Sequence, residues 1–182
     1  MITLQGSVQR TYIFPAERQA VFAYYGDLSR VLVLLDYVSI VESLAERRYR
    51  LAYQATELGL YKVRLLCDVQ AELDPRDHAL RIRPLDGGNP VRPKVGTHSL
   101  EAMAYYSSDS LFREMGERTR VEYRLALKAF IPKPFGLNLV PDTLLEQIAN
   151  NILRRRIHEI SDTFIERSIE AFILEQFVVE GG

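Results

Sequence analysis

The C-terminal part of the chain repeats apolar residues at helical spacing, and this pattern constrains the fold more than any other feature of the sequence. It begins after Pro141, and polar residues such as Asn150, Arg154 and Asp162 occupy the opposite side. A helix with one apolar face must bury that face, so the pattern predicts a helix docked on a β-sheet. The main stripe consists of Ala149, Leu153, Ile157, Ile160, Phe164, Ser168 and Phe172, and it is widened by Ile148, Ile152, Ile165, Ile169 and Ile173.

This helix is long for the size of its chain. Roughly 35 residues at about 1.5 Å each span about 52 Å. A folded chain of 182 residues has a diameter of about 40 Å. We therefore expect either a kink or an overhanging end. The tail, residues 172–179, is strongly apolar. It could cover the protein's own sheet or a partner subunit, and we predict a homodimer through the C-terminal helix.

Alternation of apolar and polar residues is clearest in residues 61–73, where the odd-numbered positions are apolar and most of the even-numbered ones are charged or polar. A period of two over this length predicts a strand with one buried and one wet face. Two short helices are predicted at 16–25 and 27–35, with Asp27 capping the second. Further strands are predicted at 4–14, 37–45, 48–56, 78–84, 96–107, 111–115 and 121–131, with a turn at 108–110.

The order of these elements favours an α+β fold over a parallel α/β fold, because the strands form one run bounded by helices. We expect a single domain over residues 1–182. In it, a curved antiparallel sheet of about six or seven strands wraps on the long C-terminal helix, with two short helices after the first strand. One helix cannot cover a broad curved sheet completely, so a cavity is expected between them.

Composition is that of an ordinary globular protein, with 47% hydrophobic and 26% charged residues. A net charge of −1 argues against a nucleic-acid partner. Cys67 is the single cysteine, which fits a reducing compartment. Neither a signal peptide nor an apolar stretch of membrane-spanning length is visible. We expect a cytoplasmic protein, or a plastid stromal one if a transit peptide was removed, without integral membrane contact.

Several stretches resemble the START-like (SRPBCC) superfamily, which includes polyketide cyclases and coenzyme-Q-binding proteins. Residues 12–17, followed by 21–22 and 27–28, look like the start of its members. Residues 116–123 are similar to its late hairpin, and Pro141 begins a C-terminal helix as in the family.

This resemblance covers nearly the whole chain at the level of element order. It implies a helix-grip fold with a deep pocket, and it carries no universal catalytic residue to this sequence. More narrowly, residues 99–102 together with Pro141 onward resemble an uncharacterised branch found in cyanobacteria and plastids.

Sequence signatures of catalysis are missing. The glycines of residues 86–90 lack the spacing of a dinucleotide-binding turn, and neither a phosphate loop nor a Gly-x-Ser-x-Gly elbow occurs. His78, His98 and His158 are not placed to converge on a metal. We therefore predict no catalytic residue, no cofactor and no metal. Cys67 lies on the apolar face of its strand and is interpreted as a packing residue.

Arg156 is the charged residue expected beside the apolar stripe of the helix, where it could meet a carboxylate or a ligand anion. The loop at 132–141 is predicted to gate the mouth of the pocket with Phe135 as its plug, the alternative being a loop merely packed on the body. The predicted cavity residues are Tyr61, Val63, Leu65, Tyr123, Leu125, Phe135, Leu153, Arg156, Ile160 and Phe164.

Three functions are compatible with these patterns. The favoured one is binding or transport of a small hydrophobic ligand, such as a lipid, isoprenoid, quinone or pigment, in the internal cavity. The second is a cyclase-like or hydrolase-like enzyme, which would need His98, Arg156 and a tyrosine to meet in one site. The third is a protein-interaction module, which would need a large exposed apolar patch near residues 172–179.

Overall fold

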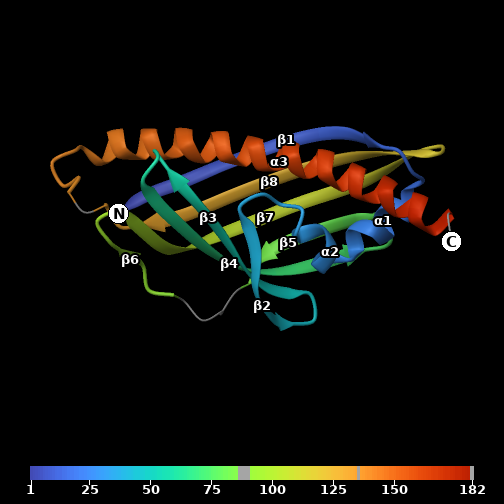
Figure 1. Cartoon of the computed structure of the whole chain (residues 1–182), viewed down its shortest axis with the longest axis horizontal. Coiled ribbons are helices and arrows are strands. Elements are labelled where there is room, and N and C mark those ends of the chain that lie inside the picture. Colours follow the sequence, from blue (N-terminus) through green and yellow to red (C-terminus); the bar gives the residue numbers. More distant parts are fainter. Residues whose placement is uncertain (86–90, 135, 181–182) are drawn as a thin grey trace.

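The computed structural model describes residues 1–85, 91–134 and 136–180, except for the side chains of residues 177–180. One curved sheet carries a long helix along its face (Figure 1). In chain order the elements are β1 (Ile2–Phe14), α1 (Arg18–Gly26), α2 (Leu28–Leu32), β2 (Val38–Ala45), β3 (Arg48–Glu57), β4 (Tyr61–Asp74), β5 (Ala79–Pro84), β6 (Lys94–Val95), β7 (Ser99–Met115), β8 (Arg118–Ile131) and α3 (Asp142–Glu180).

The sheet has the strand order β1-β8-β7-β5-β4-β3-β2, and β6 pairs with β7. The predicted α+β architecture is confirmed. The turn predicted at 108–110 is wrong, because β7 runs through these residues as one strand of 17 residues. Its ladder with β8 is unbroken there, and the side chains of Ser108 and Ser110 point into the protein and are buried. Two serines that resemble turn residues in the sequence thus belong to the interior face of a strand.

One stretch of the sheet is parallel, which an antiparallel meander would not contain. Residues 62–66 of β4 pair with residues 99–103 of β7 in parallel register. β5 separates β4 from β7 at the other end of these strands, but it is only six residues long. Where β5 ends, its two neighbours come together and pair directly. The sheet therefore stays continuous over the part that faces the first turns of α3.

α3 protects the free edge of the sheet at β1. The amide nitrogens of Thr3 and Gln5 donate to the side chains of Glu146 (2.8 Å) and Asn150 (2.7 Å) on the helix. An edge strand presents backbone donors that would otherwise need water or another chain. Close approach of helix and strand is possible because Gly6 has no side chain: a Cβ there would lie 2.8 Å from the Cδ1 atom of Ile157.

Aromatic residues fill the space between the sheet and the C-terminal half of α3. The ring of Phe14 lies 5.1 Å from that of Phe172 and 5.8 Å from that of Tyr25, measured between centroids. The Tyr25 ring also contacts Phe112 at 5.4 Å and Phe164 at 6.0 Å. Tyr24 and Tyr25 come from α1, which lies beneath this end of the helix (Figure 1). The short helices therefore close one end of the sheet.

A directed chain of hydroxyl groups crosses this aromatic end. Ser168 donates to the carbonyl oxygen of Ile165 (2.9 Å), so its own oxygen accepts from the Tyr25 hydroxyl (2.8 Å). The Tyr25 oxygen in turn accepts from the Tyr12 hydroxyl at 2.9 Å. Burial raises the pKa of Tyr25 to about 12. Ser168, placed in the apolar stripe by its spacing, is thus a buried hydrogen-bonding residue.

The predicted short helices and the long helix are confirmed, with adjusted ends. Asp27 caps α2, as expected, by accepting from the backbone nitrogen of Arg30 at 3.3 Å. In α3 the outer stripe residues Ile148 and Ile173 are exposed. No described helix is long and apolar enough to cross a membrane. The homodimer through α3 stays a prediction.

Candidate functional site

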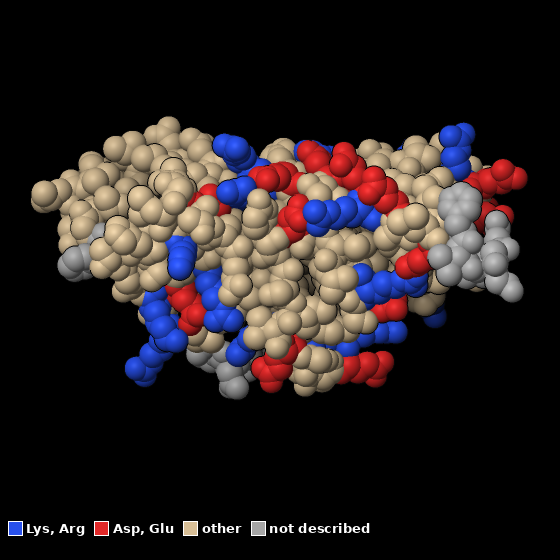
Figure 2. Space-filling model, in the orientation of Figure 1, with Lys and Arg blue, Asp and Glu red and all other residues tan. Residues whose placement is uncertain are grey.

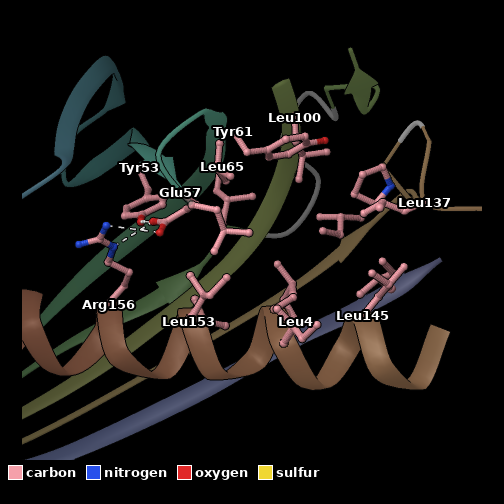
Figure 3. A pocket seen from close by; sticks show the side chains of 18 of the residues that line it. Leu4, Tyr53, Glu57, Tyr61, Leu65, Leu100, Leu137, Leu145, Leu153 and Arg156 are labelled. Atoms are coloured by element: carbon pink, nitrogen blue, oxygen red, sulfur yellow. Dashed lines mark hydrogen bonds and ion pairs between the residues drawn. The ribbon is translucent and has the colours of Figure 1, made fainter. Parts of the chain in front are cut away.

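A cavity of about 310 Å³ lies between the sheet and the N-terminal half of α3. Figure 3 shows the helix as its floor, with side chains of β1, β3, β4 and β7 and of the segment between β8 and α3 around it. Its volume is at the low end of the range for small-molecule sites. The lining consists of Ile2, Leu4, Tyr53, Glu57, Leu58, Leu60, Tyr61, Val63, Leu65, Leu100, Ile131, Pro134, Leu137, Leu145, Ile148, Ala149, Ile152, Leu153 and Arg156.

The mouth of the cavity can be placed from side chains that both line it and face solvent. These are Leu58 and Leu60 in the turn between β3 and β4, Leu137 in the loop before α3, and Ile148 on the helix. The three segments surround one opening. Pro134 and Leu137 come from the loop predicted to gate it. Phe135, the predicted plug, lies outside the described residues, and the gating role stays a prediction.

Charged groups gather at the end of the cavity opposite Leu137 and Leu145, as Figure 3 shows. The Arg156 Nε donates to Glu57 Oε1 (2.9 Å) and its Nη1 donates to Glu159 Oε2 (2.8 Å). The Tyr53 hydroxyl donates to the same Glu57 carboxylate at 2.8 Å. The Arg156 guanidinium also lies 5.1 Å from the centre of the Tyr37 ring. Arg156 therefore meets a carboxylate, one of the two outcomes expected from the sequence.

Hydrogen bonding and burial raise the pKa values of two members of this cluster. The bond to Glu57 raises the pKa of Arg156, which stays protonated at any physiological pH. Burial, followed by the bond to Glu57, raises the pKa of Tyr53, which stays neutral. Because the Glu57 and Arg156 side chains are only 12% and 20% exposed, the ion pair is a largely desolvated contact that fixes one wall of the cavity.

Polar groups of the lining are engaged by the protein itself. Arg156 and Tyr53 both donate to Glu57, and the Tyr61 hydroxyl donates to the carbonyl oxygen of Ser99 at 3.3 Å. The other described lining residues are aliphatic. The surface offered to a ligand is therefore almost entirely apolar, and it can select by shape and apolar area rather than by directed hydrogen bonds.

The predicted cavity residues are divided among three hollows. Tyr61, Val63, Leu65, Leu153 and Arg156 line the cavity of about 310 Å³. Leu125 and Ile160 line a void of about 60 Å³ farther along α3, which shares Tyr53, Leu65, Leu153 and Arg156 with the cavity. Tyr123 and Phe164 border a void of about 20 Å³ at the aromatic end. Tyr123, Leu125, Ile160 and Phe164 thus lie outside the cavity of about 310 Å³.

Several residues that line the cavity were not predicted from the sequence. Ile2 lies before the start of the predicted first strand, and Glu57 and Leu58 lie between the strands predicted at 48–56 and 61–73. Ile2 and Leu4 share a face with Val8 in the alternation of β1, so this signal was available in the sequence. Glu57 could not have been found, since its partner Arg156 is 99 residues away in the chain.

Cys67 is buried beside the void of about 60 Å³, as its strand position predicted. Burial raises the pKa of its thiol to about 12, with the neighbouring Asp68 charge adding to the effect. The thiolate is the reactive form, so we expect no modification by a thiol reagent such as Ellman's reagent at pH 8 in the native protein, and one reacting thiol in denaturant. Rapid native labelling would contradict this assignment.

Searches of protein-family models and of curated protein sequences give no significant match. Solved structures do match. The Zhui aromatase/cyclase from Streptomyces sp. R1128 has a TM-score of 0.56 at 15% identity, over 92% of this chain and 93% of that one. TTHA0849 from Thermus thermophilus has a TM-score of 0.53 at 21% identity, over 91% and 98%. The di-domain ARO/CYC protein StfQ of the steffimycin biosynthetic pathway has 0.53 at 17%, over 95% and 52%.

The chain has the helix-grip fold. At these identities the likeness concerns the fold alone, and this fold is the one that the sequence predicted. None of the three matched structures is described as coming from a cyanobacterium or a plastid, so the narrower branch is not supported. The activity in a matched protein's name belongs to that protein, and the cavity of this chain has to be interpreted from its own residues.

Proposed function

We propose that this protein binds a small apolar molecule, or the apolar part of a larger one, in the cavity between the sheet and the N-terminal half of α3. One observation carries the proposal: a cavity of about 310 Å³ whose polar lining groups already bond to the protein. Water in such a space would find few partners, whereas apolar surface transferred there leaves water at a gain of about 25 cal/mol per Å².

The residues that line the cavity indicate the chemical class of the ligand. The binding residues we propose are the aliphatic ones around the centre, chiefly Val63, Leu65, Leu100 and Leu153. A ligand with a charged end would have to leave that end at the mouth, because the Arg156 charge in the cavity wall is engaged by Glu57 and Glu159. Lipids, isoprenoids and quinones satisfy this demand with an apolar chain or ring.

Binding is tested directly with an apolar fluorescent probe such as N-phenyl-1-naphthylamine. We expect saturable enhancement of its emission by the native protein, displacement of the probe by long-chain alcohols, and loss of the signal on unfolding. Native mass spectrometry of gently purified protein should show a bound apolar adduct. A probe signal that neither saturates nor yields to a competitor would refute the proposal.

The three groups that the enzyme alternative requires, His98, Arg156 and a tyrosine, do not meet in one site. Arg156, Tyr53 and Tyr61 do lie at the cavity, but His98 is exposed and lies outside the lining. Among the described residues, no histidine borders the three hollows. Proton transfer requires a titratable group aimed into the site. We therefore propose a binding role rather than catalysis.

A further inference from the structure

Leucines and an isoleucine around the cavity mouth project into solvent, and we call this set the apolar rim. Leu139 is 99% exposed and Leu58 is 74% exposed, so most of their apolar surface lies in water. The set comes from the β3–β4 turn, the loop after β8 and the first turns of α3. Its members are Leu58, Leu60, Leu137, Leu139, Leu144 and Ile148.

Charge is sparse at this end of the molecule. Figure 2 shows the end that carries the N-terminal turns of α3 as largely uncharged on the face in view, while charged residues gather over the middle and the other end. The carboxylates in the first turns of α3 are engaged by the protein: Asp142 pairs with Lys133 (2.8 Å), and Glu146 accepts from the Thr3 amide (2.8 Å). Lys62, next to the β3–β4 turn, is exposed. An anionic or neutral apolar surface can therefore approach without meeting an exposed acidic cluster.

We infer that the apolar rim docks this protein peripherally on a lipid bilayer, so that the cavity mouth opens against the membrane. The inference rests on the proposed function, since the rim is continuous with the cavity lining at Leu58, Leu60, Leu137 and Ile148. An apolar ligand could then pass between bilayer and cavity without crossing water.

A bilayer fits this surface better than a folded partner does. The rim consists of protruding side chains on three separate segments, and its loop member Leu139 stands almost free of the protein. A rigid protein partner would need matching pockets for each protrusion, whereas the boundary of a bilayer adapts to them. Burying one leucine side chain is worth roughly 1.5–3 kcal/mol, so a few of them give measurable and reversible binding.

The depth of insertion can be measured with a single dye. Because Cys67 is buried, a Leu139→Cys variant can be labelled selectively with an environment-sensitive thiol dye. On vesicles of phosphatidylcholine, with and without phosphatidylglycerol, we expect a blue shift and a gain in emission. The matched control, Leu174→Cys, places the dye on an exposed leucine near the other end of α3 and should show no shift.

Vesicle flotation of the unlabelled chain provides the second measurement. Leu139→Asp combined with Leu144→Asp should lower vesicle binding at least tenfold, and Leu174→Asp should leave it unchanged. Neither rim position lines the cavity, and an acidic residue suits the first turn of a helix, so the double variant should fold and bind the naphthylamine probe normally.

The outcomes separate this inference from the proposed function. Probe binding without flotation, or flotation without a shift at position 139, overturns the docking inference alone. Flotation without probe binding supports docking and removes the proposed function. A dye shift that grows with protein concentration in the absence of vesicles would identify the rim as a contact between copies of the chain, and would overturn membrane docking.

Discussion

Replacing Ala149 by tryptophan is expected to reduce probe binding at least tenfold while leaving the fold intact. Ala149 lies on α3 and lines the cavity. An indole placed there takes up the space that a ligand would occupy, and the hollow of about 310 Å³ spares it the strain of an overpacked core. Thermal unfolding should therefore show unchanged or slightly raised stability.

The natural sequence contains no tryptophan, so the introduced side chain reports its own surroundings. Its emission should be blue-shifted in the Ala149→Trp variant. The matched control is Gln147→Trp, two residues away on the exposed side of the same helix, which should emit as a solvated indole and bind the probe normally. Full probe binding by a folded Ala149→Trp protein with blue emission would show that the ligand binds elsewhere.

Truncating Phe14 to alanine is expected to cost about 3–5 kcal/mol of the free energy of unfolding, the range found for large buried aromatics. Phe14 is 0% exposed, and its ring contacts those of Tyr24, Tyr25 and Phe172. These contacts join β1, α1 and α3, so the void left by truncation would lie where the three elements meet. Urea unfolding followed by circular dichroism measures the change.

Phe130 provides a matched comparison, since it is the same residue type on β8 but is 42% exposed. The Lys128 ammonium group lies 4.9 Å from the centre of its ring. Phe130→Ala should cost less than about 1 kcal/mol, as exposed truncations usually do. Similar losses for the two variants would mean that the aromatic end is loosely packed, and the division of the interior into a filled and a hollow part would then be wrong.

That division was not visible in the sequence. The stripe of α3 contains the same kind of residue at both ends, and the sequence predicted a cavity between helix and sheet without indicating which part of the stripe would line it. In the structure Leu153 lines the cavity, while Phe164 packs against the Tyr25 ring. The difference arises from α1 and α2, which occupy one end of the sheet and leave the other open. Tyr123 and Phe164 consequently border only a void of about 20 Å³.

Predictions that depended on local periodicity were confirmed, whereas features that depend on pairing between distant segments were not predicted. The alternation in residues 61–73 became β4, because a two-residue period can bury only one face of a strand. The three polar residues 108–110 were misassigned, because their chemistry is that of a turn and only the ladder between β7 and β8 overrides it. The Arg156–Glu57 pair joins α3 to the end of β3, and no local signal connects them.

The sequence by itself determined the element types, their order and the α+β class, because periodicity and turn chemistry act over a few neighbouring residues. Tertiary structure alone decided which part of the interior stays hollow, which charges close its end and which leucines surround its mouth. Those properties depend on side chains from segments far apart in the chain, and their packing exists only once the sheet has curved around the helix.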